Sequence, residues 1–284
     1  MVSFYQGEIE LEYLNGATFI LEECIDCGTI FQKEIPDDFL INKLYDEWIA
    51  PQKAFESYLK AEFSFNLPYY AQEIMTMIAF FNMVPAKLKV LDFGMGWGKW
   101  CYMAKAFGCE CYGAELSKHQ VEYAQSQGIR VIEWDEIPNH RFDLINTEQV
   151  FEHLPEPLET LCHLKAALKP DGLIKISVPN GGDIKRRLRI GDWMAAKGSR
   201  NSLNLVHPLE HINCFNHSSI IRMADIASLE QVKIPMFLQW RYATNWSGLK
   251  RTIWHLGRPL YINVFSKGTY LFFRQKGIDE VRKH

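Results

Sequence analysis

A glycine-rich stretch behind an aspartate is the part of the sequence best suited to holding a small ligand. In VLDFGMGWGKW (residues 90–100), an apolar run leads to Asp92, and Gly94, Gly96 and Gly98 follow. Glycine permits positive φ angles and lets a ligand approach the bare backbone. The helix expected next offers free N–H groups to an anionic group, whereas Asp92 would attract an ammonium or sulfonium group. The stretch therefore predicts a ligand that carries both kinds of charge.

The spacing of these glycines disfavours two common nucleotide sites. A dinucleotide site needs Gly or Ala at the last position of G-x-G-x-x-G, where this sequence has Lys99. That side chain is too large for the close helix–strand contact that glycine allows. A P-loop is excluded because no Gly-Lys-Ser or Gly-Lys-Thr follows at the required spacing. NAD and P-loop nucleotides are therefore not the expected ligands.

Two histidine-containing segments could carry out acid–base chemistry. His153 lies in QVFEH, and His211 lies in HPLEHINCFNHSSI. Histidine titrates near neutral pH, so either side chain could take a proton from a reacting hydroxyl group. Capping or bracing a loop is an equally good role for each of them on the sequence alone. We take His153 and His211 as the candidate catalytic residues.

A basic run lies between these two segments, in GGDIKRRLRIGDWMAAKGSR. The favoured interpretation is a solvated charged face. The alternative is an electropositive cover over an anionic acceptor within about residues 181–215. The residues concerned are Lys185, Arg186, Arg187, Arg189, Lys197 and Arg200.

The elements that must position these residues alternate between strand and helix patterns. Apolar periodicity predicts a helix over residues 68–81. Alternation after it predicts an α/β fold with a mostly parallel sheet flanked by helices, whose strands end at one ligand-binding edge. The expected strands are KVLDF, CECYGAE, RVIEW, FDLIN and LIKISV, and the expected helices are WGKWCYMAKAF, KHQVEYAQSQ and LETLCHLKAAL.

Residues 1–60 have a different pattern and are expected to form a small β-containing extension to a main domain at 61–284. Residues 8–31 alternate around NG (15–16) and DCG (26–28), which predicts short strands joined by tight turns.

Composition limits the class of protein. The 284 residues are 48% hydrophobic with a net charge of −3, which suits a full core and argues against binding nucleic acid through its phosphates. The N-terminus has no basic start followed by an apolar core, and no apolar stretch approaches a membrane span. Seven scattered cysteines are typical of reduced thiols. We expect a cytoplasmic protein with no nucleic-acid partner and no membrane span; the oligomeric state stays open.

Several segments resemble, in order and spacing, the motifs of class I, seven-stranded S-adenosylmethionine-dependent methyltransferases. DFGMGWG resembles the first motif and CYGAELS the second, in which Glu115 would bind the ribose hydroxyls and Leu116 would lie in the same pocket. Asp135 and Glu136 follow the third strand, where the family contacts adenine, and Asp135 is our choice for the amino group. Gln149, after the fourth strand, completes the set of cofactor-binding residues.

FDLINTEQVFEHLPEP and LKPDGLIKISVPN resemble the fourth and fifth strands of the small-molecule and ubiquinone-type branch of that family. The resemblance spans about residues 60–230. It implies a Rossmann-like sheet of seven strands, S-adenosylmethionine as cofactor, and methyl transfer to a small-molecule or glycan acceptor, which could be anionic, with oxygen favoured over carbon or nitrogen. Two other classes stay open: a non-catalytic S-adenosylmethionine-binding module and a nicotinamide-dependent dehydrogenase, which Lys99 opposes.

The segment around His211 also resembles the EH-x-x-x-F segment of this branch, with Phe215 matching. In some relatives, glutamates and histidines of these two segments hold a divalent metal. Here Gln149 replaces the first glutamate of the E-x-x-E-H pattern, although Glu148 is adjacent, and an amide is a poorer ligand for a hard cation. We therefore predict no metal.

ILEECIDCGTIF resembles a zinc knuckle in the N-terminal extension of sugar and polysaccharide-pathway methyltransferases. Those knuckles contain two Cys-x-x-Cys pairs, whereas here only Cys24 and Cys27 are present. Because tetrahedral zinc normally needs four ligands, we predict a degenerate knuckle without zinc.

Overall fold

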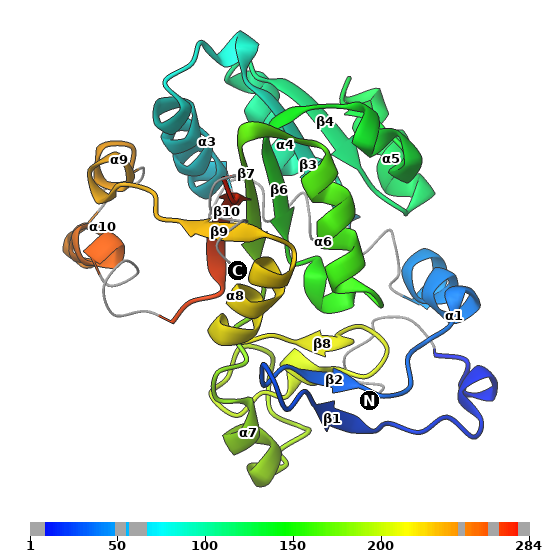
Figure 1. Cartoon of the computed structure of the whole chain (residues 1–284). Helices are drawn as coiled ribbons and strands as arrows, with labels where there is room; N and C mark the ends of the chain where they lie inside the picture. Colours follow the sequence, from blue (N-terminus) through cyan, green and yellow to red (C-terminus); the bar gives the residue numbers. More distant parts are fainter. Residues whose placement is uncertain (1–8, 49–54, 57–66, 244–247, 261–266, 278–284) are drawn as a thin grey trace.

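The computed structural model describes residues 9–48, 55–56, 67–243, 248–260 and 267–277. It contains a seven-stranded sheet flanked by helices and a separate three-stranded sheet (Figure 1). In the described part of the chain, no helix combines the length and the apolar character needed to cross a bilayer.

The large sheet has the strand order β5-β4-β3-β6-β7-β10-β9. Its strands from β5 to β7 are parallel, and β10 runs antiparallel to both of its neighbours. The predicted α/β fold with a mostly parallel seven-stranded sheet is therefore confirmed. The strands are β3 (Lys89–Phe93), β4 (Glu110–Ala114), β5 (Arg130–Val131), β6 (Phe142–Glu148), β7 (Leu168–Ser177), β9 (Leu229–Val232) and β10 (Tyr270–Gln275).

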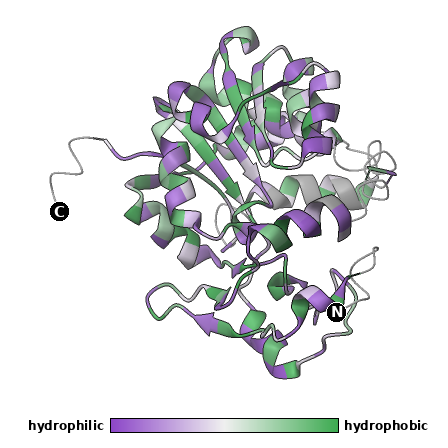
Figure 2. Cartoon of the chain, turned by 90° about the vertical axis from the view of Figure 1, so that its right-hand side faces the viewer, coloured by the Kyte–Doolittle hydropathy of each residue, from purple (hydrophilic) through white to green (hydrophobic). Residues whose placement is uncertain are grey.

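Alternating side chains of the central strands build two apolar clusters, because successive residues of a strand point to opposite faces. Leu91 and Ile145 pack in one cluster with α6 and α8, whereas Val90 and Leu144 pack in the other with α3 and α4. Figure 2 shows apolar residues concentrated along the sheet and on the inward sides of the helices. The helices are α3 (Leu67–Phe81), α4 (Lys99–Ala106), α5 (Lys118–Ser126), α6 (Pro157–Ala166), α8 (His217–Ile226), α9 (Met236–Arg241) and α10 (Leu249–Leu260).

The small sheet joins segments that lie far apart in the sequence. Antiparallel pairing links β1 (Leu21–Glu23) to β2 (Ile30–Gln32) and β2 to β8 (Asn213–Cys214). The N-terminal segment, which also contains α1 (Asp38–Lys43), is thereby tied to the region around α7 (Ile184–Ile190) and β8. One sheet therefore contains strands from both the expected extension at 1–60 and the expected insertion at 181–215. The boundaries of these two regions stay predictions.

Local differences from the expected elements have identifiable causes. The DCG turn connects β1 to β2, with the N–H of Cys24 donating to Thr29 O at 2.8 Å, but NG at 15–16 follows a 3-10 helix (Leu11–Leu14) and joins no strands. RVIEW is strand only at Arg130–Val131, because Trp134–Asn139 forms a capped 3-10 helix. β7 begins at Leu168, before LIKISV, where it pairs with Phe142 of β6. The register between the two strands then shifts between Phe142 and Leu144.

Candidate active site

The three glycines between β3 and α4 differ in their surroundings. Gly94, Gly96 and Gly98 have positive φ angles of 71°, 55° and 76°. A Cβ at Gly94 would lie 2.5 Å from a methyl group of Val150, and one at Gly98 would lie 2.7 Å from Ile129 Cδ1. A Cβ at Gly96 would meet no atom within 4 Å. Two of the glycines are therefore required by packing, and Gly96 leaves backbone open to a ligand.

Glu115 lies beside this loop because β4 pairs with β3, with Ala114 opposite Phe93. Its carboxylate accepts hydrogen bonds from the backbone N–H groups of Gly96 at 2.9 Å, Leu116 at 2.8 Å and Ser117 at 3.1 Å. A carboxylate offers about four lone-pair sites, so Glu115 keeps capacity for a further donor. The Leu116 side chain is 90% exposed and so is open to a ligand.

Replacing Glu115 by Ala is expected to weaken binding of S-adenosylhomocysteine by about 1.5–3 kcal/mol, the scale of a lost hydrogen bond to a charged group. Glu110→Ala is the matched control, because Glu110 begins the same strand and forms an exposed pair with Arg130 at 3.3 Å. Calorimetric titration of both folded variants measures the effect. Equal affinities would show that Glu115 does not contact the cofactor.

Asp92 lies under the glycine loop and is only 3% exposed. Its Oδ1 accepts a hydrogen bond from Asn146 Nδ2 at 2.7 Å, which ties β3 to β6. Burial raises the pKa of Asp92 to about 7; the Asn146 hydrogen bond and the Lys175 charge act in the opposite direction. Asp92 is therefore only partly ionised near pH 7, and a cation bound beside it would favour the charged form. A direct contact with a ligand stays a prediction.

The remaining residues expected at the cofactor lie near the ends of β5 and β6. Glu136 accepts a hydrogen bond from the Glu133 N–H at 2.8 Å and so completes a capping box, whereas the exposed Asp135 is free of that role. Gln149 is exposed at a positive φ of 56°, and its N–H donates to Ser177 O at 2.7 Å. Asp135 is therefore the better placed of the two acids for a ligand.

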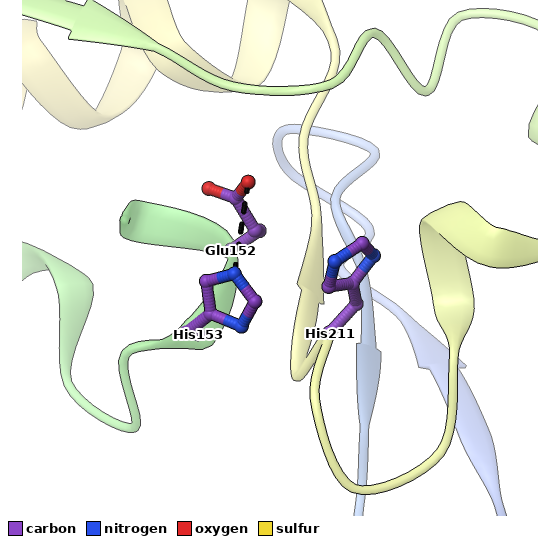
Figure 3. A group of neighbouring side chains, drawn as sticks. All are labelled: Glu152, His153 and His211. Carbon is purple, nitrogen blue, oxygen red and sulfur yellow. Dashed lines mark ion pairs between the residues drawn. The ribbon is translucent and has the colours of Figure 1, made fainter. Parts of the chain in front are cut away.

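Glu152, His153 and His211 come together from separate segments (Figure 3). Glu152 and His153 belong to the short helix η7 (Phe151–His153), which follows β6, and His211 precedes β8. Each residue offers one ligand atom, and these atoms lie within 4.8 Å of one another. The imidazole rings of His153 and His211 are 4.9 Å apart. The structure thus groups the two histidines that the sequence singled out, with a carboxyl group beside them.

A backbone carbonyl fixes the orientation of His153. His153 Nδ1 lies 2.7 Å from the carbonyl oxygen of Glu210, which can only accept, so Nδ1 carries the hydrogen in this contact. Nε2 then has the lone pair, 3.9 Å from Glu152 Oε1. Burial lowers the pKa of His153 below its ordinary value, against the opposite effect of the Glu210 carbonyl. His153 is therefore neutral near pH 7, with a free basic nitrogen.

His211 is less suited to proton transfer. Burial, followed by the charges of His153 and His207, lowers its pKa to about 3. A base so weak is poorly matched to neutral pH. Its Nδ1 has no hydrogen-bond partner in the described part of the chain, so it can still contact a ligand.

Glu152 is buried with 2% of its surface exposed, and neither carboxylate oxygen has a hydrogen-bond partner within the described residues. Burial raises the pKa of Glu152 to about 8. Because an unpaired buried charge is costly, the carboxyl group is protonated at neutral pH in the absence of a bound partner.

Glu152→Gln is expected to stabilise the protein increasingly as the pH rises. The folded state holds a proton up to about pH 8, whereas the unfolded chain releases it near the ordinary value of 4.5, so wild-type stability falls as pH rises between these values. The amide removes this loss, worth on the order of 2–4 kcal/mol at pH 8. Urea unfolding at pH 5 and pH 8 measures it, and a difference independent of pH would contradict the assignment.

The N-terminal segment contributes residues that the sequence did not predict. Tyr45, on the π-helical turn η3 (Leu44–Trp48), places Oη 3.3 Å from His153 Nδ1. Burial and the charges of Glu210, Glu115 and Glu152 raise the pKa of Tyr45, so the hydroxyl keeps its proton at neutral pH and can donate a hydrogen bond. No pattern around Tyr45 distinguishes it in the sequence.

Gln32 of β2 supports the His211 segment. Its Nε2 donates to the carbonyl oxygens of His207 at 3.1 Å and His211 at 3.0 Å, and the side chain is 5% exposed. The N-terminal strands therefore form part of the support of the site.

A buried ion-pair network lies below the glycine loop. Lys175, with no exposed surface, contacts Glu73 at 2.8 Å and Glu148 at 2.5 Å. Trp100 Nε1 donates to Glu73 at 2.7 Å, and the Tyr270 hydroxyl also donates to it. These contacts tie α3 and α4 to the sheet. A lysine inside the apolar run LIKISV was the feature of the sequence that could have indicated them.

Carboxylates neutralise much of the basic run. Asp183 pairs with Arg186 at 3.0 Å and Arg187 at 2.8 Å, and Lys185 pairs with Glu23 at 2.5 Å. Lys197 is exposed, and its charge helps to lower the pKa values of His153 and His211. A role of the run in holding an anionic acceptor stays a prediction.

Cys24 and Cys27 are free thiols in the turn between β1 and β2. Cys27 Sγ lies 3.1 Å from Thr29 Oγ1. Among the described residues, the group suited to a metal ion contains neither cysteine. The absence of zinc stays a prediction.

Curated relatives match part of the chain. Two ubiquinone biosynthesis O-methyltransferases are similar to it: that of Haemophilus ducreyi, 29% identical over 107 residues, and that of Actinobacillus pleuropneumoniae, 31% identical over 108 residues. Each alignment covers 32% of this chain, and 45% and 46% of the two relatives. The chain thus matches somewhat less than half of their length.

Solved structures share the fold. The plantazolicin methyltransferase BpumL in complex with SAH has a TM-score of 0.51 and 14% identity, over 84% of this chain and 94% of that one. Its complex with a pentazolic desmethylPZN analog and SAH has a TM-score of 0.52 and 14% identity, over 84% and 95%. Identity at this level shows the fold alone.

The model of a protein family described as "Methyltransferase domain" matches residues 60–234. That range runs from before α3 to just after β9 and contains the glycine loop, Glu115, His153 and His211. It is more than half of the chain, and the chain therefore belongs to the methyltransferase-domain family.

Proposed function

We propose that this protein transfers the methyl group of S-adenosylmethionine to a hydroxyl group of a small-molecule or glycan acceptor. Membership of the methyltransferase-domain family supports the reaction class. The curated relatives are named O-methyltransferases, which favours oxygen as the methylated atom. The free cysteines favour a reducing, cytoplasmic setting.

The residues at the ends of β3 and β4 fit the cofactor. The open backbone at Gly96 and the N-terminal end of α4 suit its methionine carboxylate. The buried Asp92 carboxyl group suits its cationic groups, which would favour the ionised form on binding, and Glu115 suits the ribose hydroxyls. S-Adenosylmethionine supplies an activated methyl group, so the chain mainly has to align the acceptor and take up its proton.

The fixed tautomer of His153 is the observation that carries the proposed mechanism. With Nδ1–H donated to Glu210 O, Nε2 can take the proton of an acceptor hydroxyl as the methyl group moves to its oxygen. Tyr45, whose hydroxyl lies 3.3 Å from His153 Nδ1, would help to position the acceptor hydroxyl beside the base. Lys197 would favour an acceptor with a negative group.

Proton uptake by His153 needs no metal, so methyl transfer is expected to survive chelation. Glu152, His153 and His211 nevertheless have one carboxylate and two imidazole groups, which suit a zinc-like cation better than magnesium. Gln149, the basis of the sequence argument against a metal, does not belong to this group. Activity measured after dialysis against EDTA distinguishes a base that works alone from a metal site. A loss of activity that one cation per chain restores would assign the three residues as metal ligands.

A labelled-methyl screen tests the function. The protein is incubated with S-adenosylmethionine carrying a radioactive methyl group and with fractions of small hydroxylated metabolites, glycans and lipids. Label is expected in a product with an O-methyl group. Label on nitrogen or carbon would contradict the oxygen assignment. Cofactor binding with no transfer to any fraction would favour a non-catalytic module.

A further inference from the structure

The segment between β9 and β10 differs in composition from the rest of the chain. Residues 233–269 contain no Asp or Glu, although the whole chain has a net charge of −3. They include three of the eight tryptophans. Tryptophan and positive charge together are typical of the boundary between water and an anionic membrane. The segment has six basic residues: Lys233, Arg241, Lys250, Arg251, Arg258 and Lys267.

Helix α10, in this segment, exposes one row of large apolar side chains. Leu249, Ile253, Leu256 and Leu260 are 77%, 61%, 54% and 46% exposed. Their spacing of four, three and four residues places them on one side of the helix. A contiguous exposed row of this kind marks an interaction surface, whereas single exposed apolar residues do not.

Helix α9 holds α10 with this row facing outward. Trp240 Nε1 donates to the carbonyl oxygen of Leu256 at 3.0 Å. Leu238 of α9 is buried, whereas Phe237 is 60% exposed and adds to the apolar surface. Helix α9 packs beside α3, and α10 lies against α9 at one side of the molecule (Figure 1). We call Phe237 and the row on α10 the α9–α10 face.

The charge of the segment selects the kind of partner. If two copies met through this face, two segments with six basic residues each and no acidic ones would be brought together, and like charges would repel. Anionic lipid headgroups complement the charge, and the acyl boundary accepts the apolar row. We propose that the α9–α10 face binds the surface of an anionic membrane, with α10 lying in the plane of the interface. This inference is independent of the methyl-transfer proposal.

Vesicle flotation with the full chain tests the proposal. The protein should float with vesicles of mixed phosphatidylcholine and phosphatidylglycerol, at least roughly 10-fold better than with phosphatidylcholine alone, and raised salt should release it. Ile253→Asp should reduce binding to the anionic vesicles by roughly 10-fold or more, because it places a carboxylate on the apolar row. K250E/R251E should reduce binding to the anionic vesicles and leave the weaker binding to phosphatidylcholine vesicles unchanged.

The matched control is Ile226→Asp, because Ile226 is 55% exposed on α8, outside this face. It should bind like the wild type, and circular dichroism and thermal melting confirm that all variants fold. Absence of wild-type binding, or equal losses in the Ile253 and Ile226 variants, would overturn the proposal. Sedimentation equilibrium adds a second readout: a wild-type dimer that Ile253→Asp dissociates, without vesicle binding, would assign the face to self-association instead.

Discussion

Replacing His153 by Asn is expected to lower the rate of methyl transfer by about 10²–10⁴-fold, the usual effect of losing a general base, with S-adenosylhomocysteine affinity unchanged. Asn can still donate a hydrogen bond to Glu210 O but has no titrating nitrogen. The affinity is expected to hold because the described contacts of His153 are with Glu210, Tyr45 and His211, whereas Glu115 is bonded to the glycine loop. The rate is measured with the acceptor identified by the labelled-methyl screen.

The pH profile separates a base from a residue that only positions the acceptor, since loss of positioning can also be costly. Burial lowers the pKa of His153, so the wild-type rate should fall as the pH drops through that lowered value, where the imidazole becomes protonated. In the variant this ionisation should disappear, and the residual rate should rise with hydroxide. His211→Asn is the control: its pKa of about 3 keeps it from titrating, so the ionisation should remain.

Full activity of His153→Asn, or the same ionisation at a lower rate, would make His153 structural. His211 would then be the next candidate for the base, despite its low pKa.

Replacing Gly96 by Val is expected to weaken S-adenosylhomocysteine binding by roughly 100-fold or more, equivalent to several lost hydrogen bonds. The Val side chain would enter the open space above the backbone, where no protein atom lies within 4 Å of a Cβ. The positive φ of 55° also strains a β-branched residue by about 1–2 kcal/mol. The fold should survive because the side chain meets no neighbour.

Gly16→Val is the matched control for backbone strain. Gly16 also has a positive φ, of 79°, with no atom within 4 Å of a Cβ, but it belongs to the turn after the 3-10 helix Leu11–Leu14 and not to the glycine loop. The Gly16→Val variant should lose about as much stability as Gly96→Val does, but its affinity for S-adenosylhomocysteine should equal that of the wild type. Wild-type affinity in folded Gly96→Val would show that the ligand does not approach this backbone.

The sheet could be predicted from the sequence because each strand and helix carries its own local pattern. The run KVLDF, followed by glycines and WGKWCYMAKAF, became β3, its loop and α4. Local pattern was insufficient where distant segments meet. The pairing of β2 with β8 links residues about 180 positions apart in the sequence, and no turn or period in either strand indicates the other.

The candidate site was predictable to the same extent. Glu115 and Gly96 adjoin because parallel strands end together, and His153 follows β6 at that edge. His211 reaches His153 from the segment before β8. Tyr45 and the carbonyl of Glu210 reach His153 through the path of the N-terminal segment and of the loop before β8. A backbone carbonyl has no identity in the sequence, so its role in orienting an imidazole becomes visible only in three dimensions.

The binding of S-adenosylmethionine tests the central claim most directly. In separate calorimetric titrations, the full chain should bind S-adenosylmethionine and S-adenosylhomocysteine with one site per chain, and NAD should give no binding heat. NAD binding without binding of either adenosyl compound would contradict the account and restore the dehydrogenase interpretation that Lys99 argues against.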